Sequence, residues 1–86
     1  MEDHLIPLNK LPIGKTAKVK QLTCDGNIRR RLLDLGLIIN TKIEMLQKNP
    51  SGDPIAYQIR GAVIALRNEE ASKIIVEIQK NINGST

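Results

Sequence analysis

Short stretches of alternating apolar and polar residues run along this chain, and they predict a protein made mainly of β-strands. Residues 16–22, 42–48 and 55–59 each place apolar side chains at every second position, which is the period of a half-buried strand. Residues 62–67 and 74–78 are apolar runs of strand length. The pattern therefore predicts five short strands.

One stretch between the first two strands follows the helical period instead. Ile28, Leu32 and Leu35 are spaced i, i+4 and i+7, so they share one face of a helix. Asp25 is the expected N-cap, and Gly36 supplies the left-handed residue that ends the helix. We therefore expect a short amphipathic helix with one apolar face toward the core.

Turn-forming residues separate the later strands. Residues 49–53 read Asn-Pro-Ser-Gly-Asp, a dense cluster of turn formers, and Arg60-Gly61 is a candidate tight turn. Asn68 is a candidate N-cap, and the two glutamates that follow it suit the positive end of a helix dipole. One helical turn is therefore expected directly before the last strand.

The order of these elements predicts a mainly β (α+β) fold, a small five-stranded SH3-like barrel. One helix is inserted after the first strand and a one-turn helix precedes the last. Barrel closure would leave no exposed sheet edge. Residues 1–86 make one domain, with an ordered core over about residues 7–79 and frayed ends at 1–7 and 81–86.

Composition narrows the classes of function. The chain has 86 residues, of which 41% are hydrophobic, but it has no Phe, no Trp and a single tyrosine, Tyr57. Proteins that bind single-stranded nucleic acids stack bases on aromatic side chains. Stacking on single-stranded bases is therefore nearly excluded. We expect no nucleic-acid partner. No segment approaches the roughly 18 to 20 unbroken apolar residues of a membrane span, so the membrane is reached only through a partner.

The basic residues are unevenly distributed. The net charge is +4, yet residues 10–31 hold seven of the thirteen lysines and arginines and one acid, Asp25. Such a segment is either a solvated face or a surface for an acidic partner or a phosphate backbone. Both readings stay open on charge alone.

The sequence contains few of the residues that catalysis would need. The chain has one histidine and one cysteine, Cys24, which has no activating partner nearby in sequence and is expected to be a small buried or half-buried residue at a strand end. Gly14-Lys15-Thr16 matches the end of a phosphate-binding loop, but Asn9 stands where that loop needs its first glycine. We therefore expect that the protein is not an enzyme and binds no nucleotide. We also expect it to reside in a reducing compartment, the cytoplasm.

Metal ligands are also scarce. The weak candidates are Glu2, Asp3 and His4, which together offer carboxylate oxygens and one imidazole near the N-terminus. A closed structural site generally requires about four ligands. We therefore expect no cofactor beyond weak binding of a transition metal.

A protein partner fits the helix better than a nucleic acid does. Successive helix residues point about 100° apart, so the arginines at 29–31 cannot form one stripe, and an ion pair from Arg30 to Asp34 would account for part of the charge. Leu33 lies off the buried face, near Arg29. An exposed leucine rimmed by arginine is typical of a protein interface. The predicted partner-binding residues are Lys18, Lys20, Arg29 and Leu33.

Four segments together resemble a known family, that of the ferrous iron transport protein FeoA. Their order and spacing carry the resemblance, which covers about residues 7–78; the segments are 31–37, 52–54, 59–61 and 64–67. The family usually has Pro-Gly after the helix, where this chain has Ile39-Asn40. Because Asn tolerates the left-handed conformation, we expect the turn to be kept.

The resemblance implies a cytoplasmic accessory of a bacterial ferrous iron uptake system. Its partner would be the membrane permease FeoB, contacted through that protein's cytosolic GTPase-bearing part. Two alternatives stay open. Similar SH3-like domains form the C-terminal module of iron- and manganese-dependent repressors, and a small basic nucleic-acid-binding barrel would also account for the charged segment.

Overall fold

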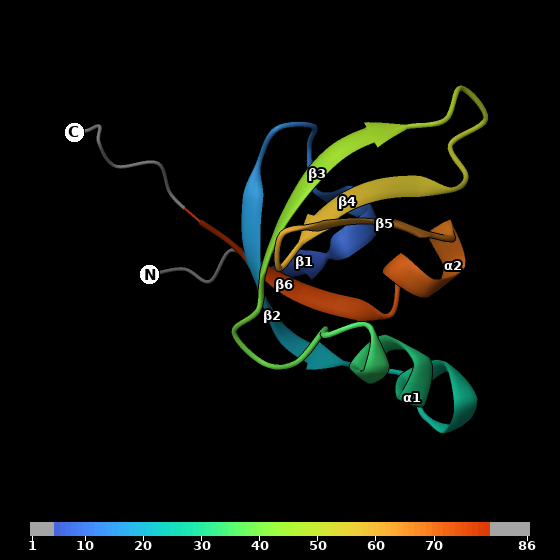
Figure 1. Ribbon diagram of the computed structural model, residues 1–86. Coiled ribbons are helices and arrows are strands. Elements are labelled where there is room, and N and C mark those ends of the chain that lie inside the picture. The colour runs from blue at the N-terminus through green and yellow to red at the C-terminus, as the bar shows by residue number, and fades with distance from the viewer. Residues whose placement is uncertain (1–4, 80–86) are drawn as a thin grey trace.

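The computed structural model describes residues 5–79, which form an antiparallel sheet accompanied by two short α-helices and one 3₁₀ turn (Figure 1). The five predicted strands and both predicted helices are confirmed, with boundaries within one or two residues of those expected. In chain order the elements are β1 (Leu5–Pro7), η1 (Leu8–Lys10), β2 (Thr16–Leu22), α1 (Gly26–Asp34), β3 (Lys42–Lys48), β4 (Ile55–Ile59), β5 (Ala62–Leu66), α2 (Asn68–Ala71) and β6 (Ile74–Ile78).

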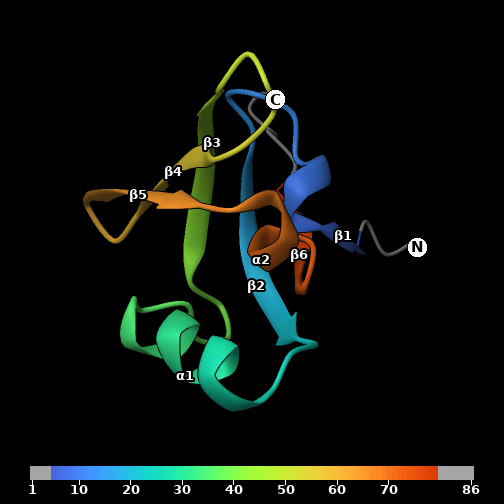
Figure 2. The same ribbon diagram turned by 90° about the vertical axis from the view of Figure 1, so that its right-hand side faces the viewer.

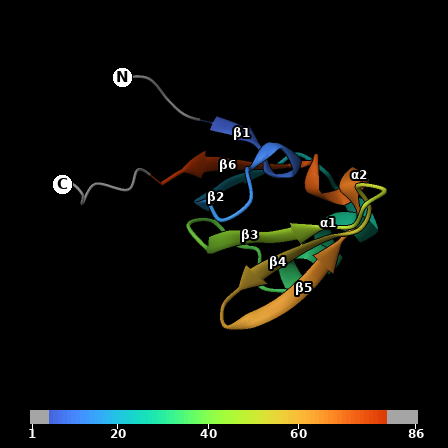
Figure 3. The same ribbon diagram turned by 90° about the horizontal axis from the view of Figure 1, so that it is seen from above.

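The sheet has six strands in the order β1-β6-β2-β3-β4-β5, and it is strongly curved when seen from above (Figure 3). The predicted count of five was wrong because residues 5–7 were assigned to a frayed end. They form β1 by pairing with β6, from Leu5 opposite Glu77 to Pro7 opposite Ile75. A three-residue strand is too short to show a period of two, so the alternation did not reveal it.

The predicted closure of the sheet is also wrong for the described residues, because β1 and β5 are edges that do not pair with each other. The 3₁₀ turn η1 lies beside β6 and α2 in the turned view (Figure 2). Its residue Leu8 is fully buried, and Tyr57 of β4 donates a hydrogen bond from its hydroxyl to the Leu8 carbonyl oxygen over 3.3 Å. The turn η1 thus packs on the core beside β6 and α2 and contributes the buried Leu8 to it.

The core lies on the concave side of the sheet and is almost wholly aliphatic. Alternate residues are buried within β3, β4 and β6, as alternation requires. Strand β2 buries Ala17 and Val19, and a register shift after Val19 then places Leu22 in the core. Burial raises the pKa of Tyr57 well above its ordinary value, since desolvation disfavours the phenolate. The fully buried large side chains are Leu8, Leu11, Val19, Leu32, Leu37, Ile43, Met45, Ile55, Tyr57, Ile59, Leu66 and Ile74.

The turn between β4 and β5 is confirmed. Arg60 and Gly61 have φ angles of 51° and 84°, and they connect the paired residues Ile59 and Ala62. Two successive residues with positive φ define the type I′ turn that suits the twist of a two-residue hairpin. This geometry also determines which backbone groups of β5 face β4.

The N-cap predicted for α2 was wrong by one residue, because Arg67 occupies that position. The Asn68 side-chain oxygen accepts a hydrogen bond from the Asn9 amide over 3.0 Å, so it is engaged away from the helix. Glu70 instead accepts from the backbone N–H of Arg67 over 3.0 Å, and Asp53 accepts from that of Asn68 over 2.9 Å. Two carboxylates therefore satisfy the amides at the start of this helix.

Between residues 5 and 79, neither helix has the length and apolar character needed to cross a bilayer.

Candidate partner-binding surface

Helix α1 projects beyond the end of β2, and its apolar face packs as the spacing predicts (Figures 1 and 2). Leu32 is fully buried, while Ile28 and Leu35 are half-buried against the core. Asp25 occupies the N-cap position, as predicted, but its carboxylate accepts no capping hydrogen bond. Gly26 follows it with a φ of 65°, a non-helical conformation that displaces the first turn from ordinary capping geometry.

The end of α1 fixes which leucine faces the core and which faces water. The N–H of Gly36 donates to the Leu33 carbonyl over 2.9 Å, and that of Leu37 donates to the Leu32 carbonyl over 3.0 Å. These two bonds, with Gly36 at φ 96°, form a Schellman motif, and the buried pair Leu32 and Leu37 supplies its apolar contact. Leu33 is 38% exposed, so its predicted exposure is confirmed.

The loop after α1 is held firmly against β2. The N–H of Asn40 donates to the Val19 carbonyl over 2.7 Å, and the N–H of Val19 donates to the Thr41 carbonyl over 2.9 Å. The buried Thr41 hydroxyl donates to the Gly36 carbonyl and accepts from the N–H of Ile38. Asn40 has a φ of 72°, which confirms the left-handed turn expected there.

This fixed loop exposes two further large apolar residues, Ile38 and Ile39, at 48% and 55%. With Leu33 they account for half of the six large exposed hydrophobic residues in the described part of the chain. The helical pattern identified Leu33 alone, because the two isoleucines follow the glycine stop and belong to no periodic stripe. Two successive apolar residues just outside a helix were the available signal. We call residues 26–41 the α1 segment.

Arginine side chains lie beside the exposed leucine. Arg29, Arg30 and Leu33 line one shallow hollow, together with Gly26 and Asp34. The Arg29 guanidinium also donates to the carbonyl of Leu22, at the end of β2, over 3.4 Å. The hollow therefore combines an apolar anchor with a basic rim.

The two predicted lysines lie on β2 and do not line that hollow. The Lys20 ammonium is 3.4 Å from a Glu77 carboxylate oxygen and 3.2 Å from the Asn40 side-chain oxygen, so it connects β2 to β6 and to the α1 segment. Lys18 stands opposite Lys42 on one side and Glu77 on the other. The structure thus brings Arg29 together with Leu33, and places the lysines on the neighbouring strand.

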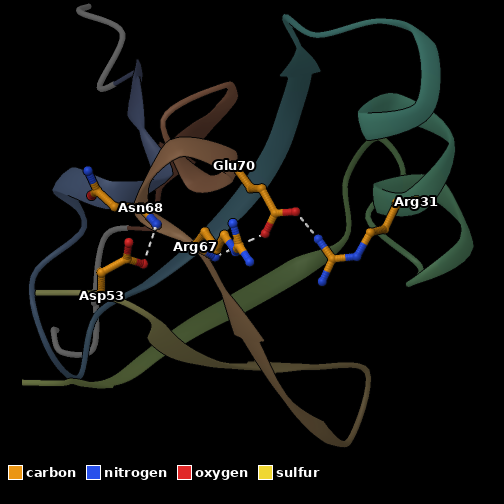
Figure 4. Close-up of polar contacts among 5 residues, drawn as sticks. All are labelled: Arg31, Asp53, Arg67, Asn68 and Glu70. Carbon is orange, nitrogen blue, oxygen red and sulfur yellow. Dashed lines mark hydrogen bonds and ion pairs between the residues drawn. The ribbon is translucent and has the colours of Figure 1, made fainter.

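An ion pair connects α1 to α2 (Figure 4). Arg31 points from α1 toward Glu70, whose carboxylate accepts from the Arg31 guanidinium and from the Arg67 backbone N–H. The expected pair of Arg30 with Asp34 was wrong: within residues 5–79 these two side chains form no ion pair and are both exposed. Glu70 is held in place by its capping bond, so the arginine that faces it is the one that pairs.

Residues with metal or redox chemistry are sparse near this surface. Cys24 is half-buried against the core at the end of β2, as expected. Across residues 5–79 the structure shows no group of three or more His, Cys, Asp or Glu side chains placed to hold a metal ion. The weak candidates Glu2, Asp3 and His4 lie outside the described residues.

Comparison with known proteins identifies the family. The FeoA domain model matches residues 6–78, nearly the whole described chain. The chain belongs to the FeoA family. The resemblance seen in the sequence is therefore confirmed, and the four segments that carried it all lie inside the matched range.

Individual relatives agree with this assignment. A curated Porphyromonas gingivalis protein, an Fe(2+) transport protein A/Fe(2+) transporter FeoB fusion, is 34% identical over 71 residues; these are 83% of this chain and only 8% of that protein. The NMR structure of a FeoA-like protein from Clostridium acetobutylicum superposes with a TM-score of 0.84 at 35% identity, covering 95% of this chain and 94% of that one.

The SH3-like fold is confirmed by a third relative. FeoA of Stenotrophomonas maltophilia, a prokaryotic SH3 domain protein solved with zinc, has a TM-score of 0.68 at 33% identity and covers 80% of this chain and 86% of its own. A manganese-dependent transcriptional repressor shares the fold at 19% identity, with a TM-score of 0.81 over 92% of this chain and 44% of that one. At that identity the likeness concerns fold alone.

Proposed function

We propose that this FeoA-family protein is a non-enzymatic accessory of a ferrous iron uptake system, and that it works in the cytoplasm without a cofactor. It binds the cytosolic, GTPase-bearing part of a FeoB-type permease. The observation that supports this most is the fusion of a related sequence to a FeoB transporter in Porphyromonas gingivalis. Fusion holds two domains at an effective concentration in the millimolar range, which favours contact between them.

The α1 segment is the proposed contact. Leu33, Ile38 and Ile39 present apolar side chains on a backbone that Thr41 and the β2 contacts hold in place. A rigid segment loses little conformational entropy on binding, so its exposed apolar area contributes more fully to affinity. Arg29, beside Leu33, would rim the contact and pair with acidic residues of the permease.

Lys18 and Lys20 are proposed to extend this basic rim along β2. Lys20 forms an ion pair with Glu77, whereas Lys18 stands between Lys42 on one neighbouring strand and Glu77 on the other. Rim charges mainly change association rates and their dependence on salt. The two lysines are therefore proposed to increase the association rate more than they slow dissociation of the complex.

Co-purification tests the proposed partner. The protein is mixed with the isolated cytosolic part of FeoB, and complex formation is followed by size-exclusion chromatography and calorimetry. A complex that weakens moderately with salt is expected. Binding to duplex DNA with a steep salt dependence, and none to FeoB, would refute the proposal and favour a nucleic-acid-binding or repressor-type role.

A further inference from the structure

Strand β5 is an edge of the sheet, and its outer side is open (Figure 3). It pairs with β4 from Ile59 opposite Ala62 to Ile55 opposite Leu66. Among residues 5–79, no other strand pairs with it, and no further backbone hydrogen bond reaches its five residues. A row of unpaired N–H and C=O groups of this kind is a template for an added strand.

The turn identifies which groups are free. In a two-residue type I′ hairpin, the residues that flank the turn exchange both hydrogen bonds, and such pairs then alternate along the ladder. Ala62, Ile64 and Leu66 therefore direct their backbone groups to β4. Val63 and Ala65 direct theirs outward, and both residues are exposed, Val63 at 65%.

This edge also lacks the usual protection against pairing. Natural edge strands are kept short or carry charged residues and proline. The other edge, β1, is three residues long and ends in Pro7. Strand β5 reads Ala-Val-Ile-Ala-Leu, with neither charge nor proline. Its openness is therefore a feature of this edge and not of the fold as a whole.

Arginines flank the open edge at both ends and determine what can occupy it. Arg60 and Arg67 are exposed, are the charged residues of positions 60–67, and form no ion pair within the described part of the chain. Antiparallel pairing of two copies about Ile64 would set Arg67 of one copy opposite Gly61 of the other, beside its Arg60. Like charges would then meet at both ends, which disfavours a second copy.

We propose that the β5 edge binds an extended peptide segment of another protein, with an apolar, alternating centre and an acidic residue at each end. The segment adds a seventh strand, and its backbone pairs with Val63 and Ala65. Its core-side apolar residues cover Ile64, which is only partly buried. The acidic ends pair with Arg60 and Arg67. This activity does not rest on the iron-uptake role, although the Arg60 side chain also lies against Gly36 of the α1 segment.

A synthetic peptide tests the proposal. The probe has ten residues, with two glutamates at each end and three valines alternating with three threonines between them. Titration into the labelled protein is followed by NMR and by amide hydrogen exchange. We expect the amides of Val63 and Ala65 to become protected, about tenfold at 90% occupancy, while amides of the α1 segment keep their exchange rates.

Matched controls distinguish the contribution of backbone pairing to peptide binding from that of the terminal charges. A peptide with lysine in place of glutamate is expected to bind about fivefold more weakly or worse. Val63→Pro removes an outward N–H that the β4–β5 ladder does not use, so the domain should fold and lose the peptide. Leu33→Ala, on the α1 segment, should bind the peptide normally.

Three results would overturn the proposal. The first is binding without protection of Val63 and Ala65, and the second is equal affinity for the lysine-ended peptide. The third is protection of the two amides that grows with protein concentration in the absence of peptide, which would assign the edge to a second copy of the chain.

Discussion

The core of the sheet and the α1 segment place the same types of aliphatic residue in opposite environments, one buried and the other exposed. Leu32 and Leu33 are neighbours on α1, yet one is fully buried and the other is 38% exposed. The core holds its leucines by packing, whereas the α1 segment holds its exposed ones through backbone bonds from Gly36, Asn40 and Thr41. Apolar residues can therefore be kept at a surface when the backbone beneath them is fixed independently of their burial.

The largest effect should come from the core side of this comparison. Leu32→Ala removes a fully buried side chain and breaks the apolar contact with Leu37. We expect the free energy of unfolding to fall by about 2 to 5 kcal/mol, measured by urea denaturation followed by circular dichroism. A loss below about 1 kcal/mol would show that α1 contributes little to the core.

Substitution of Gly36, which ends α1, should have the next largest effect on the free energy of unfolding. Gly36 has a φ of 96°, and a Cβ there would come within 2.8 Å of the Arg60 side chain. Gly36→Ala should cost about 1 to 2 kcal/mol from the left-handed backbone and more from that contact. Gly14→Ala is the control, since its φ is 82° and nothing lies within 4 Å. Equal losses in the two variants would show that the Arg60 contact costs nothing.

Alkaline pH should act on the core through Tyr57. Its folded-state pKa is raised by burial, whereas the unfolded chain releases the phenol proton near pH 10. Above about pH 10 the unfolded state therefore binds fewer protons, and stability falls by as much as 1.4 kcal/mol per pH unit. Tyr57→Phe loses the bond to Leu8, about 1 kcal/mol, but should flatten this decline. Parallel pH profiles for both proteins would contradict the assignment.

Removing the ion pair between α1 and α2 should have the smallest effect on stability. Glu70→Gln removes the charge that pairs with Arg31, whose side chain is 49% exposed against 12% for Glu70. Solvent screening limits the loss to about 1 kcal/mol or less, and added salt should reduce it further. Glu69→Gln, an exposed neighbour, is the control. A loss that salt leaves unchanged would indicate a role in capping instead of charge.

The secondary structure could be predicted from the sequence mainly where apolar residues recur at a regular spacing. Strands β2, β3 and β4 and helix α1 could be predicted because their apolar residues recur at a regular spacing. Strands β5 and β6 could be predicted as apolar runs of strand length, and α2 from its turn-forming and acidic residues. Strand β1 could not be predicted, since its three residues form a strand only by pairing with β6. Nor could the open β5 edge, because the closing of a sheet depends on contacts between chain segments far apart in sequence.

The candidate site was predictable to a smaller extent. The position of Leu33 followed from helix geometry, whereas the exposure of Ile38 and Ile39 depends on how Thr41 and Asn40 dock the loop on β2. Charged side chains were the least predictable: Arg31 pairs with Glu70, which lies 39 residues away, and Lys20 with Glu77. Such pairs form between elements that only the tertiary structure brings together.

We propose Leu33 as the residue through which the α1 segment binds the cytosolic part of FeoB. Calorimetry with that part of FeoB should compare three proteins: the unchanged chain, Leu33→Ala, and Ile13→Ala, which shortens an exposed apolar residue elsewhere. Leu33→Ala should weaken binding by about 1 to 2 kcal/mol while changing stability by about 0.5 kcal/mol or less, and Ile13→Ala should bind normally. A large loss of stability in Leu33→Ala with the affinity for FeoB preserved, or equal losses of affinity in both variants, would contradict this role for Leu33.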